Sequence, residues 1–194
     1  MGDVSTSRTD VRVTRSRAAL VDAVEEVLDE CRWSELTIGD LCSRAGVSRP
    51  TFYQHFTSPE DLLGATIHHR LDQARASVCT SADVPEILPE ILAAALVRLD
   101  DQRHEYASLA EQPAVYAQVQ AAFQDWLSGR VREDFPEASD LAIAYAVGGI
   151  ARVVGGWLTH DEDRTDPHEL VCTLWSLNLA VLGAAGRPGG AAPA

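Results

Sequence analysis

Lysine is absent from this chain of 194 residues, since all sixteen basic residues are arginine. Arginine carries a planar fork of donors that suits guanine edges and phosphates, so its exclusive use would agree with a nucleic-acid partner. A coding bias in a GC-rich genome explains the absence equally well, and we prefer that explanation. The lack of lysine therefore excludes no class of protein.

Cysteine is scarce, and its spacing excludes two classes of protein. The four cysteines, at positions 31, 42, 79 and 172, form no C-x-x-C pair, which argues against zinc knuckles and against a secreted disulfide framework. We interpret each as a small buried apolar residue. No apolar stretch reaches the length expected of a membrane span, and the polar amino terminus does not resemble a signal peptide. We expect a cytoplasmic protein with no membrane partner.

Enzyme motifs are missing as well. The chain has no G-x-S-x-G elbow, P-loop, H-E-x-x-H or G-x-G-x-x-G sequence. His68, His69 and Asp72 are close in sequence, but a polar helix surface explains them better than a metal site. The acidic run at 160–169 lacks the glycine and the regular oxygen spacing of an EF-hand loop. We expect no enzyme activity, cofactor or metal. An enzyme on a helical scaffold remains a further hypothesis, which metal analysis of the purified protein would test.

The most informative segment is TIGDLCSRAGVSRPTFYQHF, at 37–56. Thr37 and Asp40 form a T-x-x-D helix-start signal. Gly46 can take the positive φ that a tight turn between two short helices needs, and Ser48 can cap the second helix. The segment therefore predicts a helix-turn-helix, the unit that places a recognition helix in the major groove of DNA.

The second helix of this motif has two faces. Phe52 and Phe56 fall one turn apart and are expected to face inward. The outward side chains can all bond to phosphates or base edges, and they are Arg49, Thr51, Tyr53, Gln54 and His55.

The net charge of −13 at first argues against a DNA partner. However, residues 1–57 hold seven arginines and nine acidic residues, whereas residues 58–194 hold nine arginines and twenty acidic residues. The acidity therefore lies mainly outside the motif. Four arginines cluster near the amino terminus, namely Arg8, Arg12, Arg15 and Arg17. We expect them to contact the DNA backbone or minor groove, and a solvated disordered tail is the alternative.

Residues 14–74 resemble the DNA-binding domain of the TetR family of bacterial transcriptional regulators. The resemblance rests on AGVSRPTFYQHF followed by SPEDLL, with an apolar helix before the motif and a long helical remainder after it. The sequence departs from the family pattern at two positions. Arg32 stands where glycine is usual, and Pro59 stands where lysine is usual, so we carry over no phosphate contact at Pro59.

The resemblance implies a homodimer in which each subunit places Arg49 and Thr51 in a major groove. Arg44 could reach either bases or phosphates. Two recognition helices on one dimer require a palindromic operator. The residues expected to bond phosphates are Thr37, Ser48, Tyr53 and His55.

Helical spacing of apolar residues continues to the end of the chain, so we predict an all-α protein of about nine helices. An amino-terminal three-helix domain with the helix-turn-helix would precede a helical domain for ligand binding and dimerisation. The expected divisions are a disordered arm over 1–13, the DNA-binding domain over 14–74, the second domain over 75–184 and a disordered tail over 185–194.

The two helices expected at 138–160 and 167–183 carry a pattern that suits dimerisation. Small residues form a stripe on the first helix, and apolar residues repeat the same spacing on the second. These residues are Ala144, Gly148, Ala151, Gly155, Leu170, Leu174, Leu177 and Val181. The family resemblance implies that they meet the same helices of a second subunit, and ordinary packing within one chain is the alternative.

The second domain also has aromatic residues at inward positions on several helices. In proteins that this chain resembles, these helices enclose a cavity for a small, often apolar ligand. The candidates for its lining are Leu99, Tyr106, Phe123, Trp126, Tyr145 and Trp175, with Arg103 and Arg152 as polar groups. For any single residue, packing in the core is the simpler role.

Our first hypothesis is therefore a homodimeric repressor that leaves a palindromic operator when a small, largely apolar ligand binds. The alternative is a helical effector- or partner-binding protein with a degenerate DNA-binding domain, suggested by the net charge of −13 and by Pro59.

Overall fold

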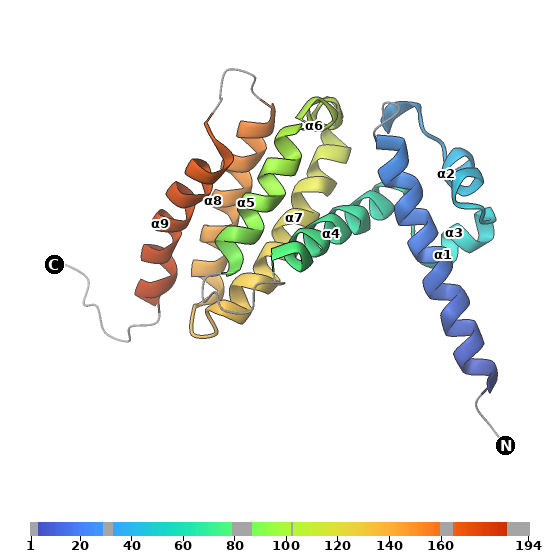
Figure 1. The fold of residues 1–194 in the computed structure, drawn as a ribbon, viewed down its shortest axis with the longest axis horizontal. Coiled ribbons are helices and arrows are strands. Elements are labelled where there is room, and N and C mark those ends of the chain that lie inside the picture. The colour runs from blue at the N-terminus through green and yellow to red at the C-terminus, as the bar shows by residue number, and fades with distance from the viewer. Residues whose placement is uncertain (1–3, 29–32, 79–86, 102, 160–164, 186–194) are drawn as a thin grey trace.

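The computed structural model describes residues 4–28, 33–78, 87–101, 103–159 and 165–185. Every regular element within these residues is a helix, so the predicted all-α fold is confirmed (Figure 1). The elements in chain order are α1 (Val4–Leu28), the 3-10 helix η1 (Trp33–Glu35), α2 (Ile38–Ala45), α3 (Arg49–His55), α4 (Pro59–Val78), α5 (Ile87–Asp101), α6 (Arg103–Ala110), α7 (Pro113–Asp134), α8 (Asp140–Thr159) and α9 (Pro167–Ala185).

Helix α1 is longer than the sequence analysis predicts. We expected a disordered arm over 1–13, but α1 begins at Val4. No glycine or proline interrupts the helix between Val4 and Leu28. A helix that is nucleated on a packed core extends easily through such residues, because each added residue gains a backbone hydrogen bond. Arg12 and Arg15 are therefore exposed on a helix and not on an irregular arm.

The amino-terminal helices share one apolar core. Leu20, Val24 and Val27 form the buried face of α1, which contacts α2, α3 and α4. Phe52 of α3 is fully buried and packs 6.0 Å, between ring centroids, from Phe56, the residue that ends the helix. The inward orientation predicted for both rings is confirmed. This core fixes the position of the helix-turn-helix on α1.

Helix α4 joins the amino-terminal helices to the rest of the molecule and lies between the two groups in Figure 1. It contacts α1, α5 and α7. At Gly64, an added Cβ would lie 3.0 Å from the side-chain nitrogen of Gln118 on α7, so the two helices approach closely there. The indole nitrogen of Trp126 donates a hydrogen bond to Asp72 at 2.8 Å. Helix α4 is therefore held on both sides.

Helices α5, α7, α8 and α9 lie side by side at the other end of the molecule, and the short α6 lies near the top of this group in Figure 1. Helix α8 contacts α6, α7 and α9, and α5 contacts α4 and α9. This group forms the second part of the hydrophobic core.

Helix α8 corrects our expectation about membrane-spanning length. Its residues, Asp140–Thr159, are long and apolar enough to cross a membrane by length and composition, although the sequence analysis anticipated no such stretch. However, 56% of this apolar stretch is buried inside the protein. Ile150 and Trp157 are each 2% exposed, as expected of a helix inside a globular core.

The cysteines within the described residues differ in their burial. Cys42 is buried between α2 and its neighbours, and burial raises the pKa of its thiol. Cys172 is exposed on α9, so our interpretation of it as a buried apolar residue is wrong. Cys31 and Cys79 lie outside the described residues.

The stripe of small residues on α8 does not form one outward face. Ala151 is fully buried within its own subunit, and Gly155 is buried as well. A Cβ on Gly155 would lie 2.5 Å from the side-chain nitrogen of Gln120 and would also clash with the hydroxyl of Tyr116, both on α7. Gly155 is therefore a point of close approach between α8 and α7.

The variant Gly155→Ala should lower the free energy of unfolding by about 1–3 kcal/mol, because the added methyl group overpacks the contact with α7. Urea denaturation followed by circular dichroism measures this change. Gly129→Ala on α7 is the matched control, since nothing lies within 4 Å of the added Cβ. The control should be neutral or stabilising by up to about 1 kcal/mol. Equal effects of the two variants would contradict the close contact at Gly155.

Candidate nucleic-acid interface and ligand cavity

Helix α2 begins with the capping box that its sequence predicts. The backbone N–H of Asp40 donates to the hydroxyl of Thr37 at 3.2 Å, and the backbone N–H of Thr37 donates to the Asp40 carboxylate at 3.0 Å. The Thr37 hydroxyl also donates to this carboxylate at 2.6 Å. These hydrogen bonds to Thr37 lower the pKa of Asp40, because they favour its ionised form.

The turn between α2 and α3 depends on Gly46, whose φ of 64° lies in the left-handed region. The backbone N–H of Val47 then donates to the carbonyl of Cys42 at 3.0 Å, which closes the end of α2. Ser48 caps α3 by accepting from the backbone N–H of Thr51 at 3.3 Å. The two helices, the glycine turn and both caps occur where the sequence analysis predicted them.

Helix α3 exposes the side chains that are candidates for contacting DNA. Arg49, Tyr53 and Gln54 are exposed, and Tyr53 keeps 59% of its surface accessible. The Arg49 guanidinium lies over Gly39 at the start of α2, where an added Cβ would be 2.9 Å from it. Sequence reasoning missed this role of Gly39, although glycine early in a short helix was a possible signal.

Several of the other candidates already bond within the protein. The Nε2 of half-buried His55 lies 2.7 Å from the hydroxyl of Ser16 on α1. Arg44 forms an exposed ion pair of 3.9 Å with Glu26, also on α1. The hydroxyl of Thr51 lies 2.8 Å from that of Ser48. The contacts of His55 and Arg44 orient these two side chains relative to α1. The hydroxyl groups of Ser48 and Thr51 keep lone pairs that can face a phosphate.

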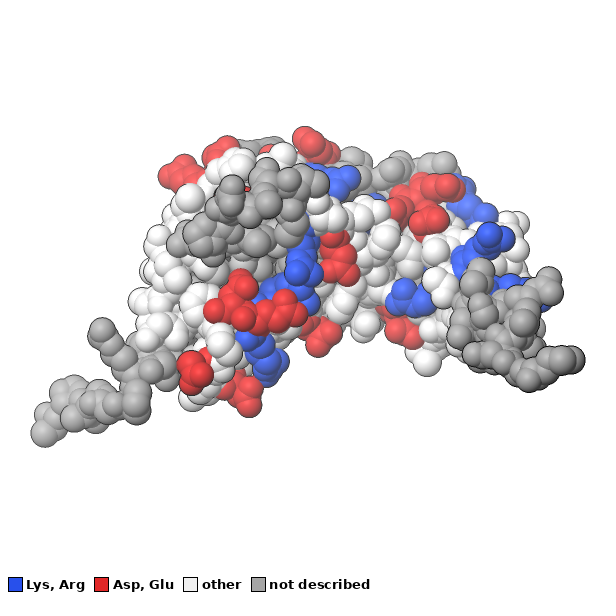
Figure 2. All heavy atoms as spheres, turned by 60° about the horizontal axis from the view of Figure 1, so that its bottom comes forward, with Lys and Arg blue, Asp and Glu red and all other residues white. Residues whose placement is uncertain are grey.

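Both signs of charge occur over the visible surface. In Figure 2, arginines lie at the right-hand end, over the amino-terminal helices, with acidic side chains beside them, and a further row of arginines lies among acidic side chains over the other helices. The guanidinium of Arg17 on α1 lies 5.4 Å from the centre of the Phe56 ring. This cation–π contact holds Arg17 against the core of helices α1, α2 and α3, which we call the reader.

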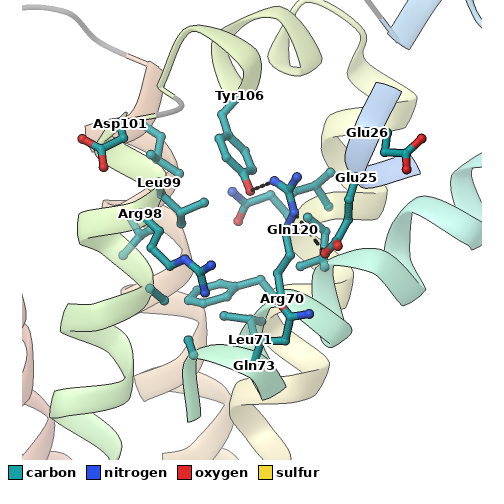
Figure 3. A pocket seen from close by; sticks show the side chains of 17 residues that line it. Glu25, Glu26, Arg70, Leu71, Gln73, Arg98, Leu99, Asp101, Tyr106 and Gln120 are labelled. Carbon is teal, nitrogen blue, oxygen red and sulfur yellow. Dashed lines mark hydrogen bonds and ion pairs between the residues drawn. The ribbon is translucent and has the colours of Figure 1, made fainter. Parts of the chain in front are cut away.

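A cavity of about 450 Å³ lies between the amino-terminal helices and the carboxyl-terminal group. Its walls come from α1, α4, α5, α6, α7 and α8 (Figure 3). Three predicted residues line it, namely Leu99, Tyr106 and Phe123. The volume falls in the range typical of small-molecule sites.

The other predicted lining residues lie elsewhere. Trp126 is buried and bonds to Asp72. Tyr145 is 71% exposed on α8, and Arg152 is exposed on the same helix. Trp175 lies in a separate void of only about 10 Å³ and packs against Phe135. A helix with apolar residues on several faces does not indicate which face meets the cavity, and this ambiguity explains the errors.

Arg103 has a structural role in place of the predicted contact with ligand. It is 6% exposed, and its guanidinium donates to the backbone carbonyl of Trp157. The guanidinium also lies 4.3 Å from the centre of the Trp157 ring and forms an ion pair of 3.1 Å with Asp100. Arg103 thus ties α6 to α5 and α8.

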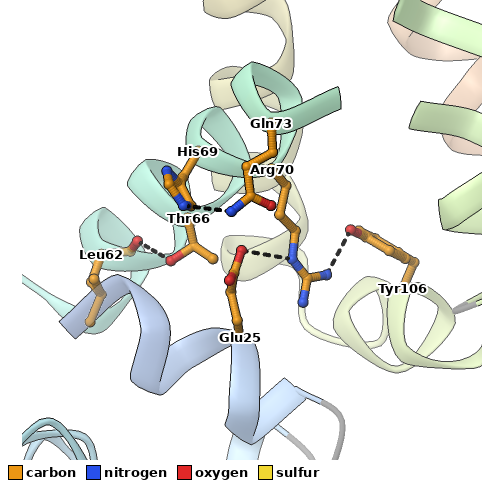
Figure 4. Close-up of polar contacts among 7 residues, drawn as sticks. All are labelled: Glu25, Leu62, Thr66, His69, Arg70, Gln73 and Tyr106. Atoms are coloured by element: carbon orange, nitrogen blue, oxygen red, sulfur yellow. Dashed lines mark hydrogen bonds and ion pairs between the residues drawn. The ribbon is translucent and has the colours of Figure 1, made fainter. Parts of the chain in front are cut away.

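The polar lining of the cavity includes residues that sequence reasoning missed. Arg70 on α4 forms an ion pair with Glu25 on α1, with 3.6 Å between Nε and the carboxylate oxygen. Arg70 also donates to the hydroxyl of Tyr106 on α6 at 3.4 Å (Figure 4). Opposite charges on α1 and α4 were the available signal, but nothing in the sequence showed that the two positions meet.

One group of side chains resembles a metal site in composition. The ligand atoms of Asp22, Glu25 and His69 lie within 4.8 Å of one another. Asp22 and His69 are exposed, and Glu25 already pairs with Arg70, so we assign no metal here. The three residues considered in the sequence analysis each have other partners: His68 lies 3.8 Å from Asp125, Asp72 accepts from Trp126 at 2.8 Å, and His69 lies 2.8 Å from Gln73.

The exposed apolar residues of α8 and α9 differ from the predicted set. Leu170 and Leu174 are each 8% exposed and pack inside the subunit, whereas Leu177 is 64% exposed. Val181 is half-buried, Gly148 is half-buried and Ala144 is exposed. On α8 the outward stripe contains Leu141, Tyr145, Gly148 and Arg152. Two positions of the outward stripe, Tyr145 and Arg152, each follow a predicted position, Ala144 or Ala151, by one residue. One residue corresponds to about 100° of rotation around the helix.

Residues 16–66 match the family model for bacterial regulatory proteins of the TetR family. These residues contain the capped α2, the turn at Gly46 and the exposed face of α3. The match covers about a quarter of the chain, so the amino-terminal part is similar to regulatory proteins of the TetR family.

Two curated relatives illustrate the extent of the similarity. The chain aligns with the transcriptional regulator EthR of Mycobacterium tuberculosis at 33% identity over 67 residues, which is 34% of this chain and 31% of EthR. The matched segment thus spans about a third of that relative. The transcriptional activator FasR of Mycolicibacterium smegmatis is 27% identical over 160 residues, covering 75% of this chain and 73% of FasR.

Solved structures extend the similarity to most of the chain. The repressor AlkX from Dietzia sp. superimposes with a TM-score of 0.58 at 19% identity, covering 86% of this chain and 97% of AlkX. The dihydroxyacetone kinase operon activator DhaS gives a TM-score of 0.54 at 14% identity, covering 87% of this chain and 97% of DhaS. At these identities the likeness shows a common fold.

The variant Thr37→Val should destabilise the protein by about 0.5–2 kcal/mol at neutral pH, because α2 loses its N-cap. The stabilisation linked to ionised Asp40 is present above its usual pKa of 3.8 and is lost as the pH falls through the lower pKa of the folded state. The variant should therefore lose less stability over this acidic range. Urea denaturation as a function of pH tests both effects, and Ser43→Ala, at an exposed position on α2, is the control.

Proposed function

We propose that this protein is a homodimeric, DNA-binding transcriptional repressor that is released from a palindromic operator by a small, largely apolar ligand. The observation that carries the proposal is the glycine-pivoted pair of capped helices, which leaves Arg49, Tyr53 and Gln54 exposed on α3. A regulator of this kind acts in the cytoplasm and needs no enzymatic activity.

In this proposal, α3 enters the major groove, where some of its side chains contact base edges and others contact phosphates. Arg49 and Thr51 contact base edges, since an arginine can donate two hydrogen bonds to guanine. Gln54 lies beside them on the same exposed face. Arg44 reaches either bases or backbone. The residues proposed to bond phosphates are Thr37, Ser48, Tyr53 and His55 from the motif, and Arg12 and Arg15 from α1.

The variant Arg49→Ala should weaken operator binding by about 1–3 kcal/mol and relax base preference at one position of each half-site. Tyr53→Phe should weaken binding to operator and to random DNA alike, because it removes a contact that carries no sequence information. Fluorescence anisotropy with both DNAs at fixed salt measures the two ratios.

Arg132→Ala is the control for loss of positive charge, because this exposed arginine lies on α7 and pairs with Asp140. Equal losses on operator and random DNA for Arg49→Ala would remove it from base reading. A wild-type protein that binds its own upstream region no better than random DNA would favour the alternative, a partner-binding protein with a degenerate reader.

We propose that the dimer forms through the outward faces of α8 and α9. Leu141, Tyr145 and Leu177 are large apolar residues that stay exposed there, and Val153 is 44% exposed. An exposed apolar patch of this kind is typical of a contact with another protein. A two-fold axis between these helices would give the reader its second half-site.

The variant Leu177→Glu should convert the dimer to a monomer, because the new carboxylate would face its own copy in an apolar contact. Val97→Glu on α5 is the matched control, since Val97 is also exposed, at 39%, but lies on a different helix. Sedimentation velocity distinguishes the two states. A Leu177→Glu protein that sediments as the wild type would contradict an interface at this residue.

We propose that a ligand in the cavity influences the DNA-binding helices, because the cavity is lined by residues of α1 and α4. Its lining includes Glu25 of α1 and Arg70 of α4. Helix α1 also contributes to the amino-terminal core. A ligand that prefers one arrangement of α1 and α4 shifts the population of the DNA-binding state, with a typical coupling of about 1–3 kcal/mol. The contacts of Arg70 with Glu25 and Tyr106 join α1, α4 and α6 at this point.

A further inference from the structure

The charged groups of the cavity point in different directions. In Figure 3 the carboxylates of Asp101 and Glu26 are directed away from the centre of the cavity, whereas the guanidinium of Arg98 is directed towards it. Glu26 pairs with Arg44 outside the lining, and Glu25 pairs with Arg70. The acidic groups are therefore turned outwards or already paired.

Arg98 differs from Arg70 in having no bound counter-ion. Arg70 is held by Glu25 and Tyr106, but Arg98 makes no hydrogen bond or ion pair with any residue in the described part of the chain. It lies on α5, on the wall next to Leu99. A guanidinium in this position presents a positive charge and several donors to whatever occupies the cavity.

The remaining walls are mainly apolar. They come from α4, α5, α7 and α8, so that an apolar body would be enclosed on several sides. The larger apolar side chains of the lining include Ile67, Leu71, Leu99, Phe123, Val154 and Leu158. Transfer of an apolar chain from water to such walls is favourable in proportion to the area buried.

We propose that the ligand of this cavity is an amphipathic organic anion, whose apolar chain packs between α4, α5 and α7 and whose anionic group binds Arg98. This inference rests on the ligand-responsive function proposed above and names the chemical class of the ligand. A carboxylate can accept two parallel hydrogen bonds from a guanidinium, which fixes the head group at the α5 wall. A neutral ligand of the same shape gains only the apolar contacts.

Isothermal titration of the full-length protein with decanoate, decanol and decylammonium, below their micelle concentrations, tests the class. Decanoate should bind about tenfold more tightly than decanol, a difference of about 1.4 kcal/mol, and decylammonium should bind more weakly than either. Arg98→Gln should remove the preference for decanoate and leave the affinity for decanol unchanged, because the apolar walls are retained.

Arg132→Gln is the matched control, since it removes an exposed guanidinium far along α7 that pairs with Asp140 at 2.7 Å. It should leave all three affinities unchanged, which separates binding at the cavity from general attraction to arginine. Equal affinities for decanoate and decanol, no binding of decanoate, or a preference for decanoate that survives Arg98→Gln would each overturn the inference.

Operator binding measured on the same preparations separates this inference from the proposed function. A protein that binds its operator specifically but prefers decanol remains a regulator with a neutral ligand. A protein that prefers decanoate but binds no operator would retain the anionic site and lose the regulatory role.

Discussion

Helix α4 has to pack against two groups of helices at once, and the remaining architecture depends on this constraint. Buried residues occur along most of its length, from Leu62 to Ala74. It contacts α1 of the reader and α5 and α7 of the second group. Protein interiors are packed as densely as organic crystals, so a displacement of α4 would change its packing against both groups of helices.

An ion pair and a hydrogen bond beside α4 join the two groups of helices. Arg70 is partly buried and bonds to one residue from each side, Glu25 of α1 and Tyr106 of α6. Removal of one partner from a buried ion pair costs more than the pair contributes, because the other charge remains desolvated. The cavity is lined by all three of these residues, so it lies next to the contacts that join the amino-terminal helices to the second group.

The net negative charge of the chain comes mainly from residues 58–194. These residues hold nine arginines and twenty acidic residues, whereas residues 1–57 hold seven arginines and nine acidic residues and are nearly balanced. Arg12, Arg15 and Arg49 are exposed on α1 and α3. Interactions between exposed charges are screened over about 10 Å at moderate ionic strength, so acids farther away than this change the field at α3 little.

The two halves of the chain differ in how far the sequence predicts them. The reader is determined locally, because the cap at Thr37, the turn at Gly46 and the cap at Ser48 each involve residues within five positions of one another. The amphipathic spacing of Phe52 and Phe56 also fixes which face of α3 is exposed. Even there, the contact of His55 with Ser16 joins residues 39 positions apart, and no local pattern indicates it.

In the second half, apolar residues occupy more than one face of α8 and α9, so spacing alone allows several rotations of each helix. The sequence therefore determined the helices, their approximate ends and the motif that recognises DNA. Only the tertiary structure decided that Gly155 packs on α7, that Arg103 stacks on Trp157, and that Arg70 and Arg98 face the cavity. The reason is physical: caps and turns are local interactions, whereas the partner of a helix face is chosen by dense packing among segments far apart in the chain.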